Sequence, residues 1–274
     1  MISEFSNYLV NLKGYSPRTA EGYVSDLRTF SRWMRVANPL ATWRTITRDD
    51  LDAYLMARVE QGASPATTNR ELASISALYR YFKRQGFDVV NPCEFESRRK
   101  VPQSQPNTIP IEDIKKAYEH ASGISRLLLG LFTTTAMRLC EVLALDWRDI
   151  DYTEKRIKVH GKGSRTRYVY TSDEVLQPLR DMSQQKQPKG LIFNLSPRAV
   201  RRLIYNALRP YSNAEQLSPH AIRHTVATHI AREGVNVATL ASILGHNHLE
   251  TTQRYIDLGQ MPISRTMQAH SIIN

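Results

Sequence analysis

Four serine–proline pairs set where four helices of this chain begin. They are Ser16-Pro17, Ser64-Pro65, Ser196-Pro197 and Ser218-Pro219. Serine is a favoured N-cap residue because its hydroxyl accepts a hydrogen bond from a backbone N–H of the first turn. Proline suits the first helical position because its missing N–H would have no intrahelical partner there. The pairs therefore predict a chain with helices in both its first and its last third.

The first 92 residues carry only helix signals. The segments that follow Ser16-Pro17 and Ser64-Pro65 have apolar residues at helical spacing. Between them, Thr47 caps a third helix that Gly62 ends, and a further helix is expected near residues 2–12. No alternating strand pattern interrupts these segments. Residues 1–92 are therefore predicted to form a compact bundle of about four helices.

Residues 91–110 interrupt the periodic pattern. The stretch NPCEFESRRKVPQSQPNTIP contains four prolines, a basic triplet and no helical or strand period. Pro-rich segments are extended because proline fixes φ and donates no backbone hydrogen bond. We therefore place an interdomain linker at residues 93–108 and a second domain at residues 109–274. Two explanations of the basic triplet stay open, contact with a nucleic-acid backbone and simple solvation.

The second domain is predicted to be mostly helical with one small sheet. Helices are expected near residues 111–120, 124–134 and 138–145, and again after the two later Ser-Pro pairs, after Asn236 and near residue 249. Residues 156–171, RIKVHGKGSRTRYVYT, alternate apolar and polar around a Gly-containing turn, which is typical of a β-hairpin. A third short strand is expected at residues 149–152. The fold class is therefore mainly α, with a small antiparallel sheet in the second domain.

The charge of the chain is compatible with a polyanionic partner. Lysine and arginine number 37 against 26 aspartates and glutamates, a net charge of +11. Such a surface attracts a phosphate backbone, although basic surfaces also serve solubility alone. Cys93 and Cys140 form no CxxC pair, so neither a zinc site nor a disulfide framework is indicated, and Cys140 is expected to be a buried thiol. Without a basic leader or an apolar run of 18 residues, a cytoplasmic protein with no membrane association is expected.

Side chains that suit attack on a phosphodiester lie in four separate segments of the second domain. Guanidinium groups can bind two phosphate oxygens at once, histidines can donate hydrogen bonds or carry a proton, and a tyrosine oxygen can act as a nucleophile. Each segment alone also has an ordinary explanation, such as a structural ion pair, a solvated HxxR face or an exposed turn lysine. The candidates are Arg138 with Glu141 in TTAMRLCEVLAL, Lys162 in HGKGSRTR, His220 and Arg223 in PHAIRHTVATHI, and His246 and Tyr255 in LGHNHLETTQRYIDL.

Five histidines within 29 residues raise the question of a metal site. His220 and His224 have the i, i+4 spacing that metal ligands on a helix use. Arg223 between them is a poor neighbour for a cation, however, and no metalloenzyme motif such as HExxH accompanies them. We therefore predict neither a metal nor any other cofactor.

The order of the four segments resembles the tyrosine site-specific recombinases, which include phage integrases and the Xer-type resolvases of chromosome dimers. The resemblance is strong over residues 109–257 and extends in general character to residues 1–92. It implies a SAM-like, core-DNA-binding N-terminal domain, and a recombinase catalytic domain that ends in a tail at residues 258–274. One departure is Ala136, where the family usually has a glycine two residues before the arginine.

The resemblance implies a role for each candidate side chain. Arg138, His220 and Arg223 would bind the scissile phosphate, with Glu141 orienting Arg138, and His220 would also be a candidate to assist proton transfer. Lys162 would protonate the departing 5′ oxygen, and Tyr255 would be the nucleophile. His246 would donate to the phosphate or to the tyrosine oxygen. Lys158, Arg165 and Arg167 are rivals for contacts with the DNA backbone. The side chains expected to contact DNA are Arg18, Thr67, Arg70, Arg80, Lys83 and Arg165.

The function expected from this resemblance is site-specific recombination through a 3′-phosphotyrosine intermediate, in integration, excision or resolution. Its partners would be double-stranded core sites and copies of itself, two on each site and four in a synaptic tetramer. Residues 263–274 would dock in a neighbouring protomer, unless they fold back on their own domain. Two other function classes stay open. One is a type IB topoisomerase-like nicking-closing enzyme, and the other is a non-catalytic DNA-binding regulator.

Overall fold

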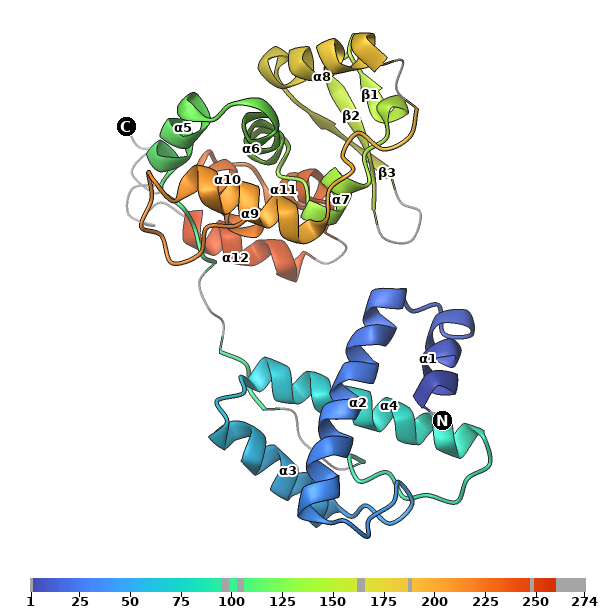
Figure 1. Ribbon diagram of the computed structural model, residues 1–274. Helices are drawn as coiled ribbons and strands as arrows, with labels where there is room; N and C mark the ends of the chain where they lie inside the picture. Colours follow the sequence, from blue (N-terminus) through green and yellow to red (C-terminus); the bar gives the residue numbers. More distant parts are fainter. Residues whose placement is uncertain are drawn as a thin grey trace, which may run out of the picture. The chain divides into compact units, whose positions relative to one another are not determined.

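The computed structural model describes residues 2–94, 99–102, 106–161, 166–186, 189–246 and 249–259. The chain divides into two compact units, Met1–Gln103 (unit 1) and Ser104–Asn274 (unit 2) (Figure 1). The boundary between them lies within residues 93–108. No helix among the described residues is long and apolar enough to cross a membrane.

Unit 1 is built from helices in its described part. Their N-termini follow the predicted caps, because the side chains of Ser16 and Ser64 accept hydrogen bonds from backbone N–H groups of the first turn, and Thr47 forms a capping box with Asp50. Helices α2 and α4 pack against each other and bury a shared apolar core. The elements are α1 (Ile2–Asn11), α2 (Pro17–Ala37), α3 (Arg48–Glu60) and α4 (Pro65–Arg84).

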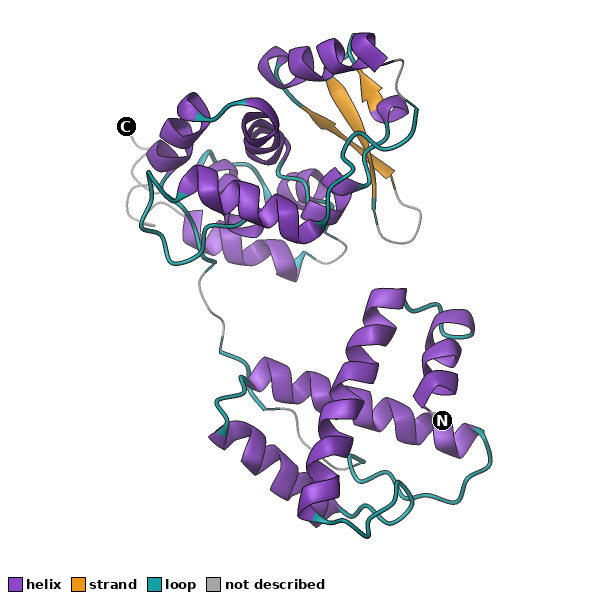
Figure 2. Cartoon of the chain, viewed as in Figure 1, coloured by secondary structure: helices purple, strands orange, loops and turns teal. Residues whose placement is uncertain are grey.

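Unit 2 combines helices with a three-stranded antiparallel sheet, as Figure 2 shows. The strands are β1 (Ile150–Asp151), β2 (Arg156–His160) and β3 (Thr166–Tyr170), with Ile157 opposite Val169. The predicted fold class, including the third short strand, is confirmed. The helices are α5 (Ile111–His120), α6 (Gly123–Thr135), α7 (Leu139–Leu143), α8 (Asp173–Lys186), α9 (Pro197–Leu208), α10 (Pro219–Arg232), α11 (Val237–Leu244) and α12 (Glu250–Gly259), with a 3₁₀ turn η1 (Trp147–Asp149) before β1.

Two helices and one thiol differ from the sequence interpretation. Helix α8 was not expected, because Pro178 stands inside it and polar residues hide its apolar period. Helix α7 is shorter than predicted, because Arg138 has extended backbone (φ −74°, ψ 152°) and is the N-cap. Cys140 is exposed and not buried, because the buried side of this short helix is formed by Glu141 and Val142.

The core of unit 2 is centred on α6. Figure 1 shows α6, α9 and α10 lying together, and α6 contacts both of the other helices. Leu128 and Phe132 of α6 and Ile222 of α10 are fully buried in a cluster to which the sheet adds Ile157. On its other side α10 packs against α12. Because α10 packs against α12, the candidate residues His220 and Arg223 of α10 lie on a helix that is in contact with the helix of Tyr255.

Candidate active site

Three arginines from different parts of the chain meet at the C-terminal end of α11. The backbone oxygens of residues 243–245 accept, in that order, from Arg167 Nε at 3.2 Å, Arg223 Nη2 at 2.7 Å and Arg138 Nη2 at 3.0 Å. The last carbonyls of a helix lack intrahelical partners and carry the negative end of its dipole. Three consecutive carbonyls therefore hold three guanidinium groups close together.

Glu141 is the carboxylate within this arginine cluster, and its side chain is only 4% exposed. Its two oxygens accept from Arg167 Nη1 and Nη2, each at 2.9 Å, and Oε1 also accepts from Arg138 Nη1 at 2.9 Å. The backbone N–H of Arg138 donates to Oε2 at 2.7 Å. Burial raises the pKa of this carboxyl, but the bonds from Arg167 and Arg138 outweigh it, and the pKa of Glu141 is lowered overall. Glu141 is therefore an anion that fixes both arginines.

Arg223 is the most deeply buried of the three arginines, with 2% of its surface exposed. Its Nη1 donates to the carbonyl of Ala136 at 2.5 Å, and its Nη2 lies 3.1 Å from His246 Nε2. Burial, followed by repulsion from Arg138, lowers the pKa of Arg223 to about 10. The guanidinium group thus stays protonated at neutral pH and is held on several sides.

Ala136 keeps the backbone conformation that glycine would favour. It caps the C-terminus of α6 with φ 50° and ψ 25°, in the left-handed region. An L-residue with a side chain pays roughly 1–2 kcal/mol for this conformation. Since its carbonyl accepts the bond from Arg223, the departure from the usual glycine leaves the arginine's backbone partner in place.

Tyr255 lies on α12, beside His224 and His246. It is 1% exposed. Its hydroxyl is 2.5 Å from His224 Nδ1, and its ring stacks on that of His246 with centroids 6.3 Å apart. His246 Nδ1 is in turn 2.8 Å from the hydroxyl of Thr252. Tyr255 therefore lies next to the arginine cluster, on the side where His246 contacts Arg223.

The histidine that touches Tyr255 was not among the predicted site residues. His220 is exposed, and its ring meets the ring of His224 edge-on at 4.2 Å. His224 is 7% exposed and lies where α10 packs on α12. A signal is present in the sequence, since His224 directly follows Arg223 and is one helical turn from His220, but an i, i+4 pair of histidines is equally typical of metal ligands. Among the described residues, no group of three or more His, Cys, Asp or Glu side chains could hold a metal ion.

Several predicted residues cannot be placed or lie elsewhere than expected. Lys162 and Arg165, and the tail at residues 263–274, fall outside the described residues, so these remain predictions. Arg167, a rival candidate for contact with the DNA backbone, has a side chain that is 14% exposed and binds Glu141. Lys158 is half-buried on β2.

The DNA-binding candidates of unit 1 lie mainly on α4. Arg70 binds the buried Asp26 through Nη2 at 2.7 Å, and Lys83 lies 3.8 Å from Glu94. Thr67 is 3.0 Å from the cap hydroxyl of Ser64, whereas Arg18 and Arg80 are exposed.

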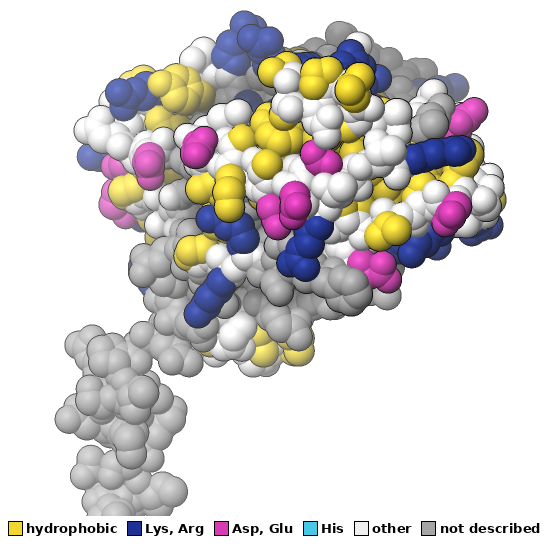
Figure 3. All heavy atoms as spheres, turned by 90° about the horizontal axis from the view of Figure 1, so that it is seen from below, with side chains coloured by type: hydrophobic (Ala, Val, Ile, Leu, Met, Phe, Trp, Pro, Cys, Tyr) yellow, Lys and Arg dark blue, Asp and Glu magenta, His cyan; other side chains and the backbone are white. Residues whose placement is uncertain are grey.

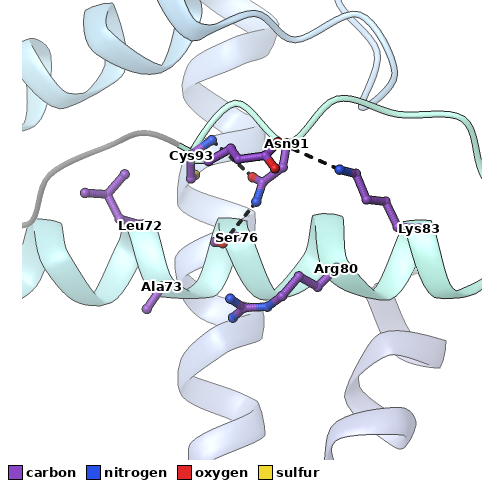
Figure 4. Close-up of a pocket in the computed structure, with 8 residues that line it drawn as sticks. Leu72, Ala73, Ser76, Arg80, Lys83, Asn91 and Cys93 are labelled. Carbon is purple, nitrogen blue, oxygen red and sulfur yellow. Dashed lines mark hydrogen bonds and ion pairs between the residues drawn. The ribbon is translucent and has the colours of Figure 1, made fainter.

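Basic side chains also line a pocket on unit 1. Figure 4 shows Arg80 and Lys83 on α4 beside Asn91 and Cys93, which also line the pocket. The pocket has a volume of about 400 Å³. Over the face seen in Figure 3, basic side chains are interspersed with acidic and hydrophobic ones and form no single patch. Of the expected DNA contacts, Arg70 and Lys83 are paired with acidic side chains of the same unit.

Comparison with known proteins places these residues in a family context. Sequence models of the phage integrase family and of the phage integrase N-terminal SAM-like domain match residues 108–260 and 2–86. The tyrosine recombinase XerC of Myxococcus xanthus is 28% identical over 93% of this chain and 92% of its own length. XerC of Bacillus pumilus is 27% identical over 98% and 95%.

Solved structures show the same fold. The XerH recombinase bound to its difH substrate aligns with a TM-score of 0.74 at 19% identity, covering 100% of this chain and 85% of that one. A lambda integrase dimer bound to a core site gives a TM-score of 0.72 at 18% identity, covering 95% and 77%. At these identities the likeness concerns the fold.

Proposed function

This chain belongs to the phage integrase family, and we propose that Tyr255 is the nucleophile with which it cleaves and rejoins DNA in site-specific recombination. The observation that carries this assignment is the surroundings of the phenol. Its oxygen contacts His224, and its ring contacts His246, which in turn lies beside Arg223. Most tyrosines of a protein serve packing, and a buried phenol beside two histidines and an arginine is suited to chemistry.

The proposed reaction is a reversible transesterification. Tyr255 Oη bonds to phosphorus while the bond from phosphorus to the 5′ oxygen breaks, which leaves a 3′-phosphotyrosine and a free 5′ hydroxyl. Arg138 and Arg223 stabilise the added negative charge on the non-bridging oxygens. Lys162 gives a proton to the departing oxygen. The covalent ester keeps the bond energy, so rejoining by a new 5′ hydroxyl needs no ATP.

The enclosed position of Tyr255 implies a resting arrangement. At 1% exposure its oxygen cannot meet a phosphate on DNA unless the side chain or its cover moves. The side chain of Arg138, by contrast, is 37% exposed. We therefore expect DNA to engage Arg138 first and attack to follow once Tyr255 is uncovered.

The proposed substrate is duplex DNA that carries core sites, bound by two protomers on each site and by four in the synapse. The net charge of +11 favours such a polyanion. Structural neighbours include XerH bound to difH and a lambda integrase tetramer bound to a Holliday junction. We extend this assembly to the present chain, with residues 263–274 docking in a neighbouring protomer.

A deletion tests the role of the tail. Removing residues 263–274 should leave binding of a single core site intact and abolish higher-order DNA complexes in native gels. Normal assembly and recombination by the truncated protein would show that the tail does not couple the protomers.

A nicked suicide substrate tests the nucleophile. Tyr255→Phe removes one oxygen and no charge, so DNA binding should persist while the covalent protein–DNA adduct disappears from denaturing gels. Tyr205→Phe, at a position 47% exposed on α9, is the matched control and should form the adduct normally. An adduct formed by the Tyr255→Phe protein would assign the attack to another residue. Efficient relaxation of plasmids without a core site, by the monomer, would favour the nicking-closing alternative.

A modified leaving group tests Lys162. Lys162→Ala should cut cleavage of ordinary DNA severely, because the 5′ oxygen then leaves without its proton. A 5′-bridging phosphorothiolate, whose sulfur leaves unprotonated, should restore cleavage. If it does not, the proton donor is another residue, and Arg165 and Lys158 would be tested next.

In unit 1 we propose that Arg18 and Arg80, with Thr67, Arg70 and Lys83, contact DNA. Phosphate contacts release counterions, so each lost contact reduces the slope of binding against salt concentration. Arg70 and Lys83 already have acidic partners, and Arg18→Gln with Arg80→Gln should therefore flatten the slope more than Arg70→Gln with Lys83→Gln. An unchanged slope in both proteins would mean that this face does not meet DNA.

A further inference from the structure

We propose that His224 is the catalytic residue that accepts the proton of Tyr255 when the tyrosine attacks phosphorus. The inference rests on the proposed role of Tyr255 and adds a residue that the recombinase pattern did not supply. Its basis is a contact: His224 Nδ1 lies 2.5 Å from the tyrosine hydroxyl. That is the reach a general base needs, and both side chains are more than nine-tenths buried.

The chemistry requires a proton acceptor at this oxygen. A phenol has an ordinary pKa near 10, so it carries its proton at neutral pH and is then a weak nucleophile. Imidazole, with an ordinary pKa near 6.5, is the side chain best matched to taking a proton in this range. In the neutral tautomer that carries its proton on Nε2, His224 accepts the hydrogen bond of the tyrosine hydroxyl at Nδ1.

The other two histidines of the site are placed for different tasks. His246 stacks its ring on that of Tyr255, and its two nitrogens lie beside the Thr252 hydroxyl and Arg223 Nη2. His220 is exposed and touches His224 through its ring. Both are thus placed to bind a phosphate that enters from solvent, whereas His224 contacts the phenol oxygen itself.

The step balances in atoms and charge. As the bond from Tyr255 Oη to phosphorus forms, the phenol proton passes to His224 Nδ1, and the 5′ oxygen leaves with a proton from Lys162. The imidazolium formed is compensated by the negative charge that the phosphate brings into the arginine cluster. In the rejoining step His224 returns the proton to Tyr255. The bound phosphate therefore favours proton acceptance by His224.

An isosteric variant separates this role from a structural one. His224→Asn places an amide oxygen near the position of Nδ1, so it can accept the hydrogen bond from Tyr255 but cannot take the proton. We expect unchanged DNA binding and a fall of about 100-fold or more in single-turnover adduct formation on the suicide substrate. Hydrogen exchange of α10 and α12 in the full chain would verify that the variant is folded.

Fluorotyrosine at position 255 provides the decisive rescue. Ring fluorines lower the pKa of the phenol, so the attack depends less on a base, and adduct formation by the His224→Asn protein should rise about tenfold or more. The same replacement should give no comparable gain in a His220→Asn protein. That variant would cleave slowly because it binds the phosphate less well, and a more acidic phenol does not restore phosphate binding. A 5′-bridging phosphorothiolate should rescue Lys162→Ala but not His224→Asn, because it relieves only the leaving group.

Three outcomes would overturn the proposal. They are normal cleavage by the His224→Asn protein, slow cleavage that fluorotyrosine does not improve, and cleavage faster than in the unaltered protein. The last would make His224 a latch that holds Tyr255 in its buried position. Each result is distinct from a failure of the proposed function, which would appear as an adduct formed by the Tyr255→Phe protein.

Discussion

Replacing Arg167 by methionine should destabilise unit 2 strongly, although this residue is outside the set first expected to be catalytic. The side chains of Arg167 and Glu141 are 14% and 4% exposed, so their ion pair is largely shielded from water. Methionine keeps much of the apolar stem and removes three hydrogen bonds, two to Glu141 and one to the carbonyl of Ile243. Glu141 then keeps only its bonds to Arg138.

The expected loss in the free energy of unfolding follows because the buried carboxylate of Glu141 keeps only two of its four hydrogen bonds. Removing one partner of a buried ion pair costs about 3–5 kcal/mol. Because Arg138 and its backbone N–H still bind Glu141, we expect a loss near the lower end, about 3 kcal/mol in the free energy of unfolding of unit 2. That corresponds to roughly a 100-fold change in the unfolding equilibrium.

Hydrogen exchange of the full chain measures this effect within one molecule. The most protected amides of α6 and α10 should exchange roughly 100-fold faster in the Arg167→Met protein, while those of α2 and α4 in unit 1 serve as the internal reference. Arg148→Met is the matched control, because Arg148 also binds a carboxylate, that of Asp146, but is 87% exposed, and its loss should leave exchange unchanged. Exchange within about threefold of the unaltered protein in Arg167→Met would refute the reasoning.

Three further substitutions test other parts of the structure. In the folded protein the pKa of Glu141 is lowered from its ordinary value of 4.5. The ionised carboxylate therefore stabilises the fold fully at a pH above 4.5. This stabilisation is lost as the pH falls through the lowered pKa of the folded state. Glu141→Gln should remove this part of the acid dependence of the urea midpoint, and an unchanged dependence would contradict it. Ala136→Gly should change the stability of unit 2 by less than about 1 kcal/mol, because relief of the left-handed backbone offsets a lost buried methyl and added chain entropy. A larger change in the urea midpoint would contradict that balance. Asp26→Asn should destabilise unit 1 by about 1 kcal/mol, since its partner Arg70 is 57% exposed, and faster exchange in α2 and α4 alone would show it. If hydrogen exchange in unit 2 became faster by the same factor, the destabilisation would not be confined to unit 1.

The sequence by itself determined the elements that depend on neighbours along the chain. Ser16, Ser64, Ser196 and Ser218 start helices because each side chain accepts a hydrogen bond from an N–H three residues later. The hairpin of β2 and β3 likewise follows from an alternating pattern around one turn. The residue types that suit phosphodiester chemistry were also evident, because their order along the chain is specific. Helix α8 escaped prediction because its local signals conflict.

Only the tertiary structure decided which of these side chains meet. Arg138 binds the carbonyl of Gly245 across 107 residues, and no local pattern encodes that pairing. The packing of α10 on α12 chose His224 over His220 as the partner of Tyr255. The fold likewise turned Arg167 inward to Glu141, although its sequence position left it a rival for contact with DNA. Caps and periodicity constrain the dihedral angles of neighbouring residues, whereas contacts between distant helices depend on how their buried faces fit together.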